Sequence, residues 1–193
     1  MQPTDRPLGE FLDDIASEQV APAGGSVIAT TGAMGAALCE MVCVHTIAAG
    51  DAETSTATLG DLREDLERRR RSLLALADRD AAVVEELFGA RRGQPSARLA
   101  KRATGVPLAI AEACLHVLED ADRVIDLGAG GVVADARIGA SLADSALRAS
   151  LWMVRANLDT LAESSFAAEV ADRAAAVERA AADLSVSLGN PTG

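Results

Sequence analysis

The chain has 193 residues, and its 29 acidic and 18 basic residues give a net charge of −11 at neutral pH. So negative a protein repels duplex nucleic acid and anionic membrane surfaces, and we expect neither nucleic acid nor a membrane as a partner. Hydrophobic residues make up 49% of the chain but aromatic residues only 2%, and much of the apolar content is alanine, a strong helix former. The composition predicts an all-α protein, and the length suits one domain over residues 1–193.

The hydrophobic pattern predicts about six helices in chain order. A short amphipathic helix at residues 8–15 precedes a break at 20–25, a long apolar helix at 26–49 and a long charged helix at 56–89. Pro107 predicts a kink, or a helix start near residue 106, in the next helical segment. Long helices with short breaks favour an up-and-down bundle, and small residues on several faces favour a helix-packed homodimer. The last three helical segments are expected at about 96–126, 135–162 and 166–188.

Residues 27–49 are apolar enough to raise the question of a membrane span. Because they contain Glu40 and His45 and are rich in Gly, Ala and Thr, we expect a buried helix instead. The N-terminus lacks the hydrophobic region of a signal peptide.

The cysteine count is odd, which argues against a disulfide framework and favours a reducing, cytoplasmic compartment. Two of the cysteines share a helix face near His45, but with no fourth candidate ligand nearby we expect no metal site. The cysteines are Cys39, Cys43 and Cys114.

The charged helix at 56–89 has a heptad-like apolar seam that is interrupted by Arg69 and Asp80. A carboxylate on a core face raises the free energy of the folded state unless it is paired or hydrogen-bonded. Two interpretations stay open: an internal salt bridge or a seam that drifts to the surface, and a carboxylate that faces a cleft.

Two glycine-containing segments precede helices. Gly24, Gly25 and Ser26 leave main-chain N–H groups accessible at a helix start, which Ser26 can cap, and such a terminus favours an anion or a carbonyl oxygen. The glycines at 128–131 look like a nucleotide loop, but a helical pattern precedes them and no βα units follow, so we expect a turn between helices. Asp135 begins the next helix, either as an N-cap or as a general acid or base beside a glycine-lined pocket.

A basic stretch with no acidic residue lies between Phe88 and Ile110. On so acidic a protein it could hold a polyanionic tail, or it could be a charged loop that pairs with acids elsewhere. Its basic residues are Arg91, Arg92, Arg98, Lys101 and Arg102.

Several segments together resemble one known family. In chain order they are PAGGS at 22–26, GAMGAAL at 32–38, MV at 41–42, Thr46, DA at 80–81, ATGVPL at 103–108, ADA at 134–136 and NL at 157–158. In this order and spacing the chain resembles the cyclodeaminase/cyclohydrolase family, which includes methenyltetrahydrofolate cyclohydrolases and the C-terminal domain of formiminotransferase-cyclodeaminase. The resemblance covers roughly residues 8–166, and the glycine-serine start is its most specific part.

The resemblance implies an all-helical homodimer that binds a tetrahydrofolate derivative as substrate and needs no metal or redox cofactor. The chain is too short to include a formiminotransferase domain, which favours a stand-alone cyclohydrolase that converts 5,10-methenyltetrahydrofolate to 10-formyltetrahydrofolate. The alternatives are a formiminotetrahydrofolate cyclodeaminase that releases ammonia, and a catalytically silent folate-binding or structural helical dimer.

The resemblance also implies roles for single residues. Asp135 and Asp80 are expected to transfer protons or orient the substrate, and Ser26 with the amides of Gly24 and Gly25 to bind the reacting group or the pterin. These roles require Ser26, Asp80 and Asp135 to meet around one cavity, within a chain or across a subunit boundary.

Thr46 and Asn157 are expected to supply hydrogen bonds to the substrate. The basic residues Arg98, Lys101 and Arg102 are expected to meet the folate glutamate tail. The chain departs from the family pattern at Ala23, where a glycine is usual, and at residues 130–133, where asparagines are usual.

Overall fold

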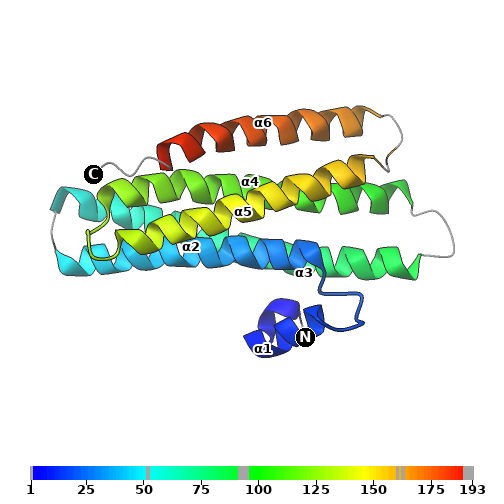
Figure 1. Ribbon diagram of the computed structural model, residues 1–193, viewed down its shortest axis with the longest axis horizontal. Helices are drawn as coiled ribbons and strands as arrows, with labels where there is room; N and C mark the ends of the chain where they lie inside the picture. Colours follow the sequence, from blue (N-terminus) through cyan, green and yellow to red (C-terminus); the bar gives the residue numbers. More distant parts are fainter. Residues whose placement is uncertain (1, 51–52, 91–95, 160, 162–163, 189–193) are drawn as a thin grey trace.

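The computed structural model describes residues 2–50, 53–90, 96–159, 161 and 164–188. These residues form a 3-10 helix and six α-helices without any strand, which confirms the predicted all-α fold (Figure 1). The elements are η1 (Pro3–Asp5), α1 (Leu8–Ile15), α2 (Gly24–Ala49), α3 (Glu53–Gly89), α4 (Ala97–Leu127), α5 (Val133–Leu158) and α6 (Ser165–Leu188).

Helices α2 to α5 lie side by side as a four-helix core, and α6 packs on α4 and α5 (Figure 1). The contacts fix the helix directions, since Ser26 near the start of α2 meets Ala77 late in α3, while Glu40 further along α2 meets Arg70 earlier in α3. Helices α2 and α3 are therefore antiparallel, as an up-and-down bundle requires. Helix α1 and the N-terminus lie to one side of this core (Figure 1).

Helix α2 packs closely against α5 because glycines face each other where the two helices meet. A Cβ atom placed on Gly35 would lie 2.5 Å from the Gly139 carbonyl oxygen and 3.2 Å from the Ala143 nitrogen. Only residues without a bulky side chain allow two backbones to approach this closely. Gly35 and Gly139 thus allow α2 and α5 to pack closely.

Helix α2 is, among the described helices, the one that is long and apolar enough by length and composition to span a membrane. Its core-facing side chains are fully buried between α3, α4 and α5, as expected for the central helix of a bundle. These fully buried side chains are Ala29, Ala36, Cys39, Val42 and Cys43.

The seam of α3 is buried as its heptad spacing predicts, with Leu62, Leu66 and Leu73 completely inaccessible to solvent. Arg69, one of its two polar interruptions, forms a salt bridge with Asp120 of α4 at 3.2 Å. The internal salt-bridge interpretation is therefore correct for Arg69, and Asp80 remains to be explained.

Helix α4 runs without interruption through Pro107, so the alternative of a helix start near residue 106 is wrong. Proline cannot donate a hydrogen bond to the carbonyl four residues earlier, here that of Ala103. The Asn157 side-chain amide of α5 donates a 2.8 Å hydrogen bond to this carbonyl instead. A neighbouring helix therefore supplies the donor that lets α4 continue.

We predict that Gly35→Ala destabilises the protein, because the new methyl group would clash with the backbone of α5. The free energy of unfolding in urea should fall by roughly 1–3 kcal/mol. Gly60→Ala in α3 is the matched control, since a Cβ atom there would meet no atom within 4 Å. The control should be neutral or stabilising by up to about 1 kcal/mol. Equal stabilities of the two variants would contradict the proposed close packing.

Candidate functional site

A buried pair, Ser26 of α2 and Asp80 of α3, lies where the first turn of α2 packs on α3. The Ser26 hydroxyl is 3.1 Å from Asp80 Oδ2 and 3.0 Å from the Ala77 carbonyl oxygen. Ser26 is completely buried, and Asp80 is only 4% exposed. Two of the residues expected at the site are therefore in contact, although 54 positions separate them in the sequence.

The Asp80 carboxyl group occupies the space that a side chain at position 25 would take. A Cβ atom on Gly25 would lie 2.1 Å from Asp80 Oδ1, so only glycine fits. Ser26 was expected to cap α2, but the helix already begins at Gly24, after Ala23, which makes no side-chain cap. The acceptor at this helix start comes instead from α3, and a carboxylate there interacts favourably with the helix dipole.

Burial raises the pKa of the Asp80 carboxyl above its ordinary value of 3.8, while hydrogen bonds from the side chain and main chain of Ser26 lower the pKa in part. The single hydroxyl proton of Ser26 can be donated either to Ala77 or to Asp80. When Asp80 is protonated, it donates to Ser26, and Ser26 donates to Ala77. The site can therefore hold a carboxyl group in either protonation state, as a general acid and base requires.

No described cationic side chain forms a salt bridge with Asp80, which distinguishes it from Asp120. Burial also raises the pKa of Asp120, but the Arg69 guanidinium opposes this shift. A buried carboxyl group without a cation is costly to fold and is a common mark of a functional site. Asp80 therefore fits neither the salt-bridge interpretation nor that of a seam that drifts to the surface.

Asp135 lies far from this pair within one chain. The Ala136 carbonyl oxygen next to it is 3.7 Å from the Sγ atom of Cys39, which follows Ser26 by 13 residues of α2. At 1.5 Å of rise per residue, this places Asp135 about 20 Å from Ser26 along the helix. The expectation that Ser26, Asp80 and Asp135 surround one cavity is therefore wrong for a single chain, because they contact different parts of α2.

The local prediction for Asp135 also needs correction. Helix α5 begins at Val133 after Val132, so Asp135 is the third residue of the helix and not its N-cap. The carboxylate still suits the first turn of a helix. The turn between α4 and α5 confirms that the glycines at 128–131 connect two helices.

Thr46 and Asn157, which were expected to bind substrate, both hold the backbone. The Thr46 hydroxyl accepts a 3.0 Å hydrogen bond from the Ala129 N–H and so anchors the turn between α4 and α5. Asn157 donates to the carbonyl of Ala103, which Pro107 leaves without its usual helical donor. The sequence motif containing Pro107 and the one containing Asn157 thus have a shared structural role.

The basic stretch lies partly outside the described residues, since Arg91 and Arg92 belong to the range 91–95. Arg98, Lys101 and Arg102 line an open hollow of about 400 Å³ on α4. Arg102 forms two hydrogen bonds, of 2.9 and 2.6 Å, to the Glu86 carboxylate. This residue therefore fits the alternative in which the basic stretch pairs with acidic residues elsewhere. The Lys101 ammonium lies 5.1 Å from the ring centroid of Phe166 in α6.

The three cysteines are free and buried. Burial raises the pKa of the Cys39 thiol to about 12 and that of Cys43 to about 11. These thiols are therefore protonated at neutral pH and behave as small apolar side chains.

Two buried polar residues carried no prediction from the sequence: Asp120 of α4, which pairs with Arg69, and Ser150 of α5. Ser150 of α5 is completely buried, and its hydroxyl has no hydrogen-bond partner among the described residues. Gly139 of α5 lies against Gly35 of α2, and the two helices are antiparallel. Ser150 is 11 residues after Gly139, and Gly24 is 11 residues before Gly35. Ser150 therefore lies opposite the first turn of α2. Its position in the apolar stripe of α5 was the available signal, of the same kind that pointed to Asp80.

Comparison with known proteins agrees with this fold. Residues 7–176 match the family model described as formiminotransferase-cyclodeaminase. The chain belongs to this family. It is 35% identical over 172 residues to a methenyltetrahydrofolate cyclohydrolase of Methylorubrum extorquens, with 82% of each chain covered.

Two further relatives are similar to this chain. It is 28% identical over 180 residues to the formimidoyltransferase-cyclodeaminase of Sus scrofa, covering 87% of this chain but only 33% of that protein. The crystal structure of a formiminotetrahydrofolate cyclodeaminase from Thermotoga maritima superposes with a TM-score of 0.90 at 22% identity, covering 96% of this chain and 94% of the other. The latter similarity establishes the shared helical fold.

We predict that Asn157→Ala destabilises the protein, because it leaves the carbonyl of Ala103 without a donor. The loss should be roughly 1–3 kcal/mol in chemical denaturation. Replacing Pro107 by Ala restores the main-chain donor, so Asn157→Ala should be much less harmful in a Pro107→Ala background. Additive effects of the two substitutions would refute the structural role of Asn157.

We predict that Asp80→Asn increases stability at neutral pH. Because the pKa of Asp80 is raised in the folded protein, its folded form binds protons more tightly than its unfolded form. The wild type therefore loses stability relative to the variant as the pH rises from 3.8 to the pKa of Asp80 in the folded protein. The measurement is urea unfolding across this pH range.

Asp61→Asn, at an exposed position of the same helix, is the control for this experiment. It should show no such pH-dependent gain. A variant at position 80 that is less stable than wild type at every pH would show that the carboxyl group is structural.

Proposed function

We propose that this protein is a one-carbon folate enzyme that hydrolyses 5,10-methenyltetrahydrofolate to 10-formyltetrahydrofolate, with Asp80 as its proton-transfer residue. The observation that carries the proposal is the buried Asp80 carboxyl, which has no described cationic partner and contacts Ser26 beside Gly25. The family and the similarity to a named cyclohydrolase support the choice of substrate.

The proposed reaction needs one group that accepts and then returns a proton. Asp80 in its ionised form takes a proton from water as the oxygen bonds to the amidinium carbon that bridges N5 and N10. The protonated carboxyl then gives a proton to N5 as the bond from this carbon to N5 breaks. The hydroxyl on the carbon releases its remaining proton to solvent and becomes the carbonyl oxygen of the formyl group on N10. Burial raises the pKa of Asp80 and so makes its protonated form more accessible than that of an ordinary carboxyl group.

The start of α2 supplies the second requirement, which is stabilisation of the tetrahedral intermediate. The first main-chain N–H groups of a helix have no partner within the helix, and Gly24 is exposed with no neighbouring atom in the way of a side chain. These donors would contact the developing oxygen charge. Because only water and protons are exchanged, the proposed reaction requires no metal or redox cofactor.

The substrate's glutamate tail is assigned to the hollow lined by Arg98 and Lys101, as the charge of this stretch suggests. Glu86, which pairs with Arg102, is six residues beyond Asp80 on α3, a rise of about 9 Å. The tail site and the reacting group would therefore lie at the same end of the bundle. Three free, buried cysteines support a reducing, cytoplasmic location.

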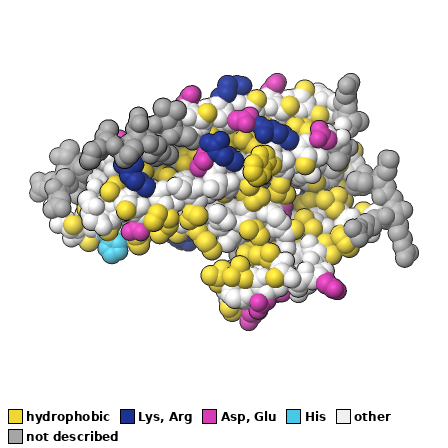
Figure 2. Space-filling view, in the orientation of Figure 1, with side chains coloured by type: hydrophobic (Ala, Val, Ile, Leu, Met, Phe, Trp, Pro, Cys, Tyr) yellow, Lys and Arg dark blue, Asp and Glu magenta, His cyan; other side chains and the backbone are white. Residues whose placement is uncertain are grey.

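We also propose that the protein is a homodimer that pairs through α2 and α5. These two helices leave four large apolar side chains exposed, and hydrophobic side chains gather over this face in Figure 2. A two-fold axis near the middle of α2 would set the Ser26 end of one subunit beside the Asp135 end of the other. The four side chains are Met34, Val44, Ile138 and Trp152.

We predict that purified wild-type protein accelerates the loss of the near-UV absorbance of methenyltetrahydrofolate beyond its spontaneous hydrolysis. Asp80→Asn should reduce kcat by roughly 10²- to 10⁴-fold, because the amide cannot transfer the proton. Asp61→Asn should retain the wild-type rate. Release of ammonia from formiminotetrahydrofolate, without this hydrolysis, would favour the cyclodeaminase instead.

The contribution of Asp135 is tested in the same assay. If each site takes Asp80 from one subunit and Asp135 from the other, Asp80→Asn and Asp135→Asn will both be inactive. A refolded equimolar mixture of the two should then recover about a quarter of the wild-type rate, since half the dimers contain one intact site of two. A rate near zero in the mixture excludes the shared site, and saturable folate binding without turnover would indicate a silent relative.

A further inference from the structure

A polar recess of about 260 Å³ opens beside the proposed reacting group. One wall is α3, including Ala81, the residue after Asp80, and another is the segment that leads to α2 and includes Pro22. Its size is below that of pockets for whole drug-sized ligands, and it suits one ring system.

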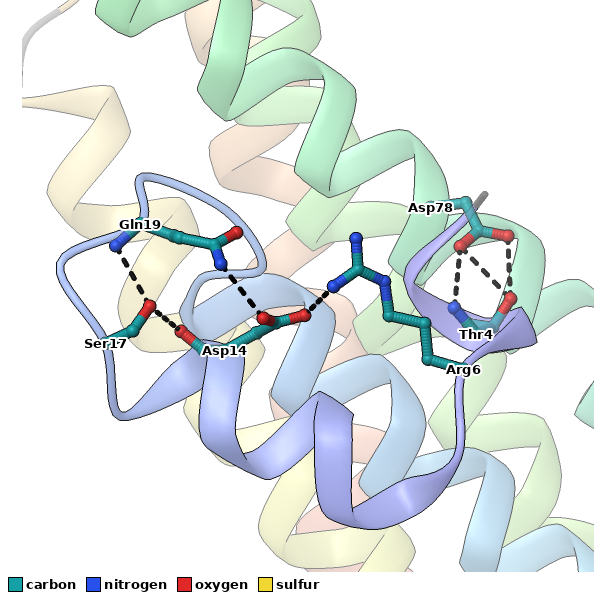
Figure 3. Close-up of polar contacts among 6 residues, drawn as sticks. All are labelled: Thr4, Arg6, Asp14, Ser17, Gln19 and Asp78. Atoms are coloured by element: carbon teal, nitrogen blue, oxygen red, sulfur yellow. Dashed lines mark hydrogen bonds and ion pairs between the residues drawn. The ribbon is translucent and has the colours of Figure 1, made fainter.

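The outer wall of the recess is the N-terminal segment, which hydrogen bonds hold in place (Figure 3). The Thr4 hydroxyl donates at 2.9 and 3.1 Å to the Asp78 carboxylate, and its main-chain N–H donates at 3.3 Å. Arg6 forms an ion pair with Asp14, and Gln19 donates to the same carboxylate at 3.0 Å. The wall is therefore built before a ligand arrives.

The polar atoms left over in the recess are mainly acceptors. Because the Gln19 side-chain nitrogen donates to Asp14, its carbonyl oxygen remains available. Glu85 is exposed, and its carboxylate has no partner among the described residues. Asp78 adds a second carboxylate, while the charge of Arg6 is offset by Asp14. With two carboxylates against one paired guanidinium, the recess favours a ligand that presents N–H donors and disfavours an anionic group.

We propose that this recess binds the pterin ring of the substrate through its 2-amino-4-oxopyrimidine edge, with Glu85 accepting from the 2-amino group and N3–H. This inference rests on the proposed folate function. It also fixes the direction of the substrate, because the recess is negative and the hollow at Arg98 and Lys101 is positive. Glu85 and Glu86 are about 100° apart around α3, so the two ends of the substrate lie on different flanks of this helix.

The test is calorimetric binding of two fragments, 6-methyltetrahydropterin and p-aminobenzoylglutamate, to wild-type and Glu85→Gln protein. The substitution should weaken binding of the pterin roughly tenfold, because it removes a charge-assisted pair of hydrogen bonds. Binding of p-aminobenzoylglutamate should not change. In turnover, KM for methenyltetrahydrofolate should rise while kcat stays near the wild-type value.

Glu10→Gln, at an exposed position of α1, is the matched control and should bind both fragments as wild type does. If the wild type turns over substrate and Glu85→Gln binds the pterin as tightly as wild type does, the assignment of the pterin ring to this recess is wrong and the proposed function is unaffected. Absence of turnover in wild type would count against the proposed function alone, because fragment binding is measured without it. If wild-type protein does not bind 6-methyltetrahydropterin, the proposal that this recess binds the pterin ring is wrong.

Discussion

The structure depends on the contact between the Asp80 carboxyl and the first turn of α2. A carboxyl group in the core of a helical bundle is unfavourable because its charged form loses hydration. Here Gly25, which has no side chain, leaves space for the carboxyl group. The start of α2 and the Ser26 hydroxyl donate hydrogen bonds to it. The same arrangement holds the carboxyl group in place and leaves its pKa above the ordinary range. Stability is thus reduced at the position where a proton-transfer group is proposed, as is common in enzymes.

The charge of the molecule is distributed in a way that fits one substrate orientation. Although the chain is strongly acidic, Arg98 and Lys101 form a local basic hollow, whereas the recess beside Pro22 is lined by carboxylates. A folate has a neutral, donor-bearing ring at one end and carboxylates at the other. The proposed orientation follows from this asymmetry, and it places the reacting carbon between the two ends, near Asp80.

Much of the fold could be predicted from the sequence because helix periodicity and breaks are local properties. The helix bounds, the buried seam of α3 and the polar anomaly at Asp80 all follow from spacing along one chain. The contact of Ser26 with Asp80 could only be guessed from a family resemblance, since it joins two helices.

Other features could not be predicted because they depend on which helix faces which. The role of Asn157 follows from its position beside the Ala103 carbonyl, and nothing near residue 157 signals that Pro107 is its counterpart. The separation of Asp135 from Ser26 arises from the antiparallel register of α5 on α2. The type of a residue indicates which chemistry its side chain can perform, whereas the packing of the helices determines which groups lie close enough to interact with it.

The most direct test of the central claim is a crystal structure with 5-formyltetrahydrofolate, which resembles the product and is not turned over by the proposed reaction. We expect the formyl carbon to lie within about 4 Å of the Asp80 carboxyl, a contact distance, beside the first turn of α2. A formyl group bound elsewhere, with Asp80 still covered by Ser26 and Gly25, would contradict it.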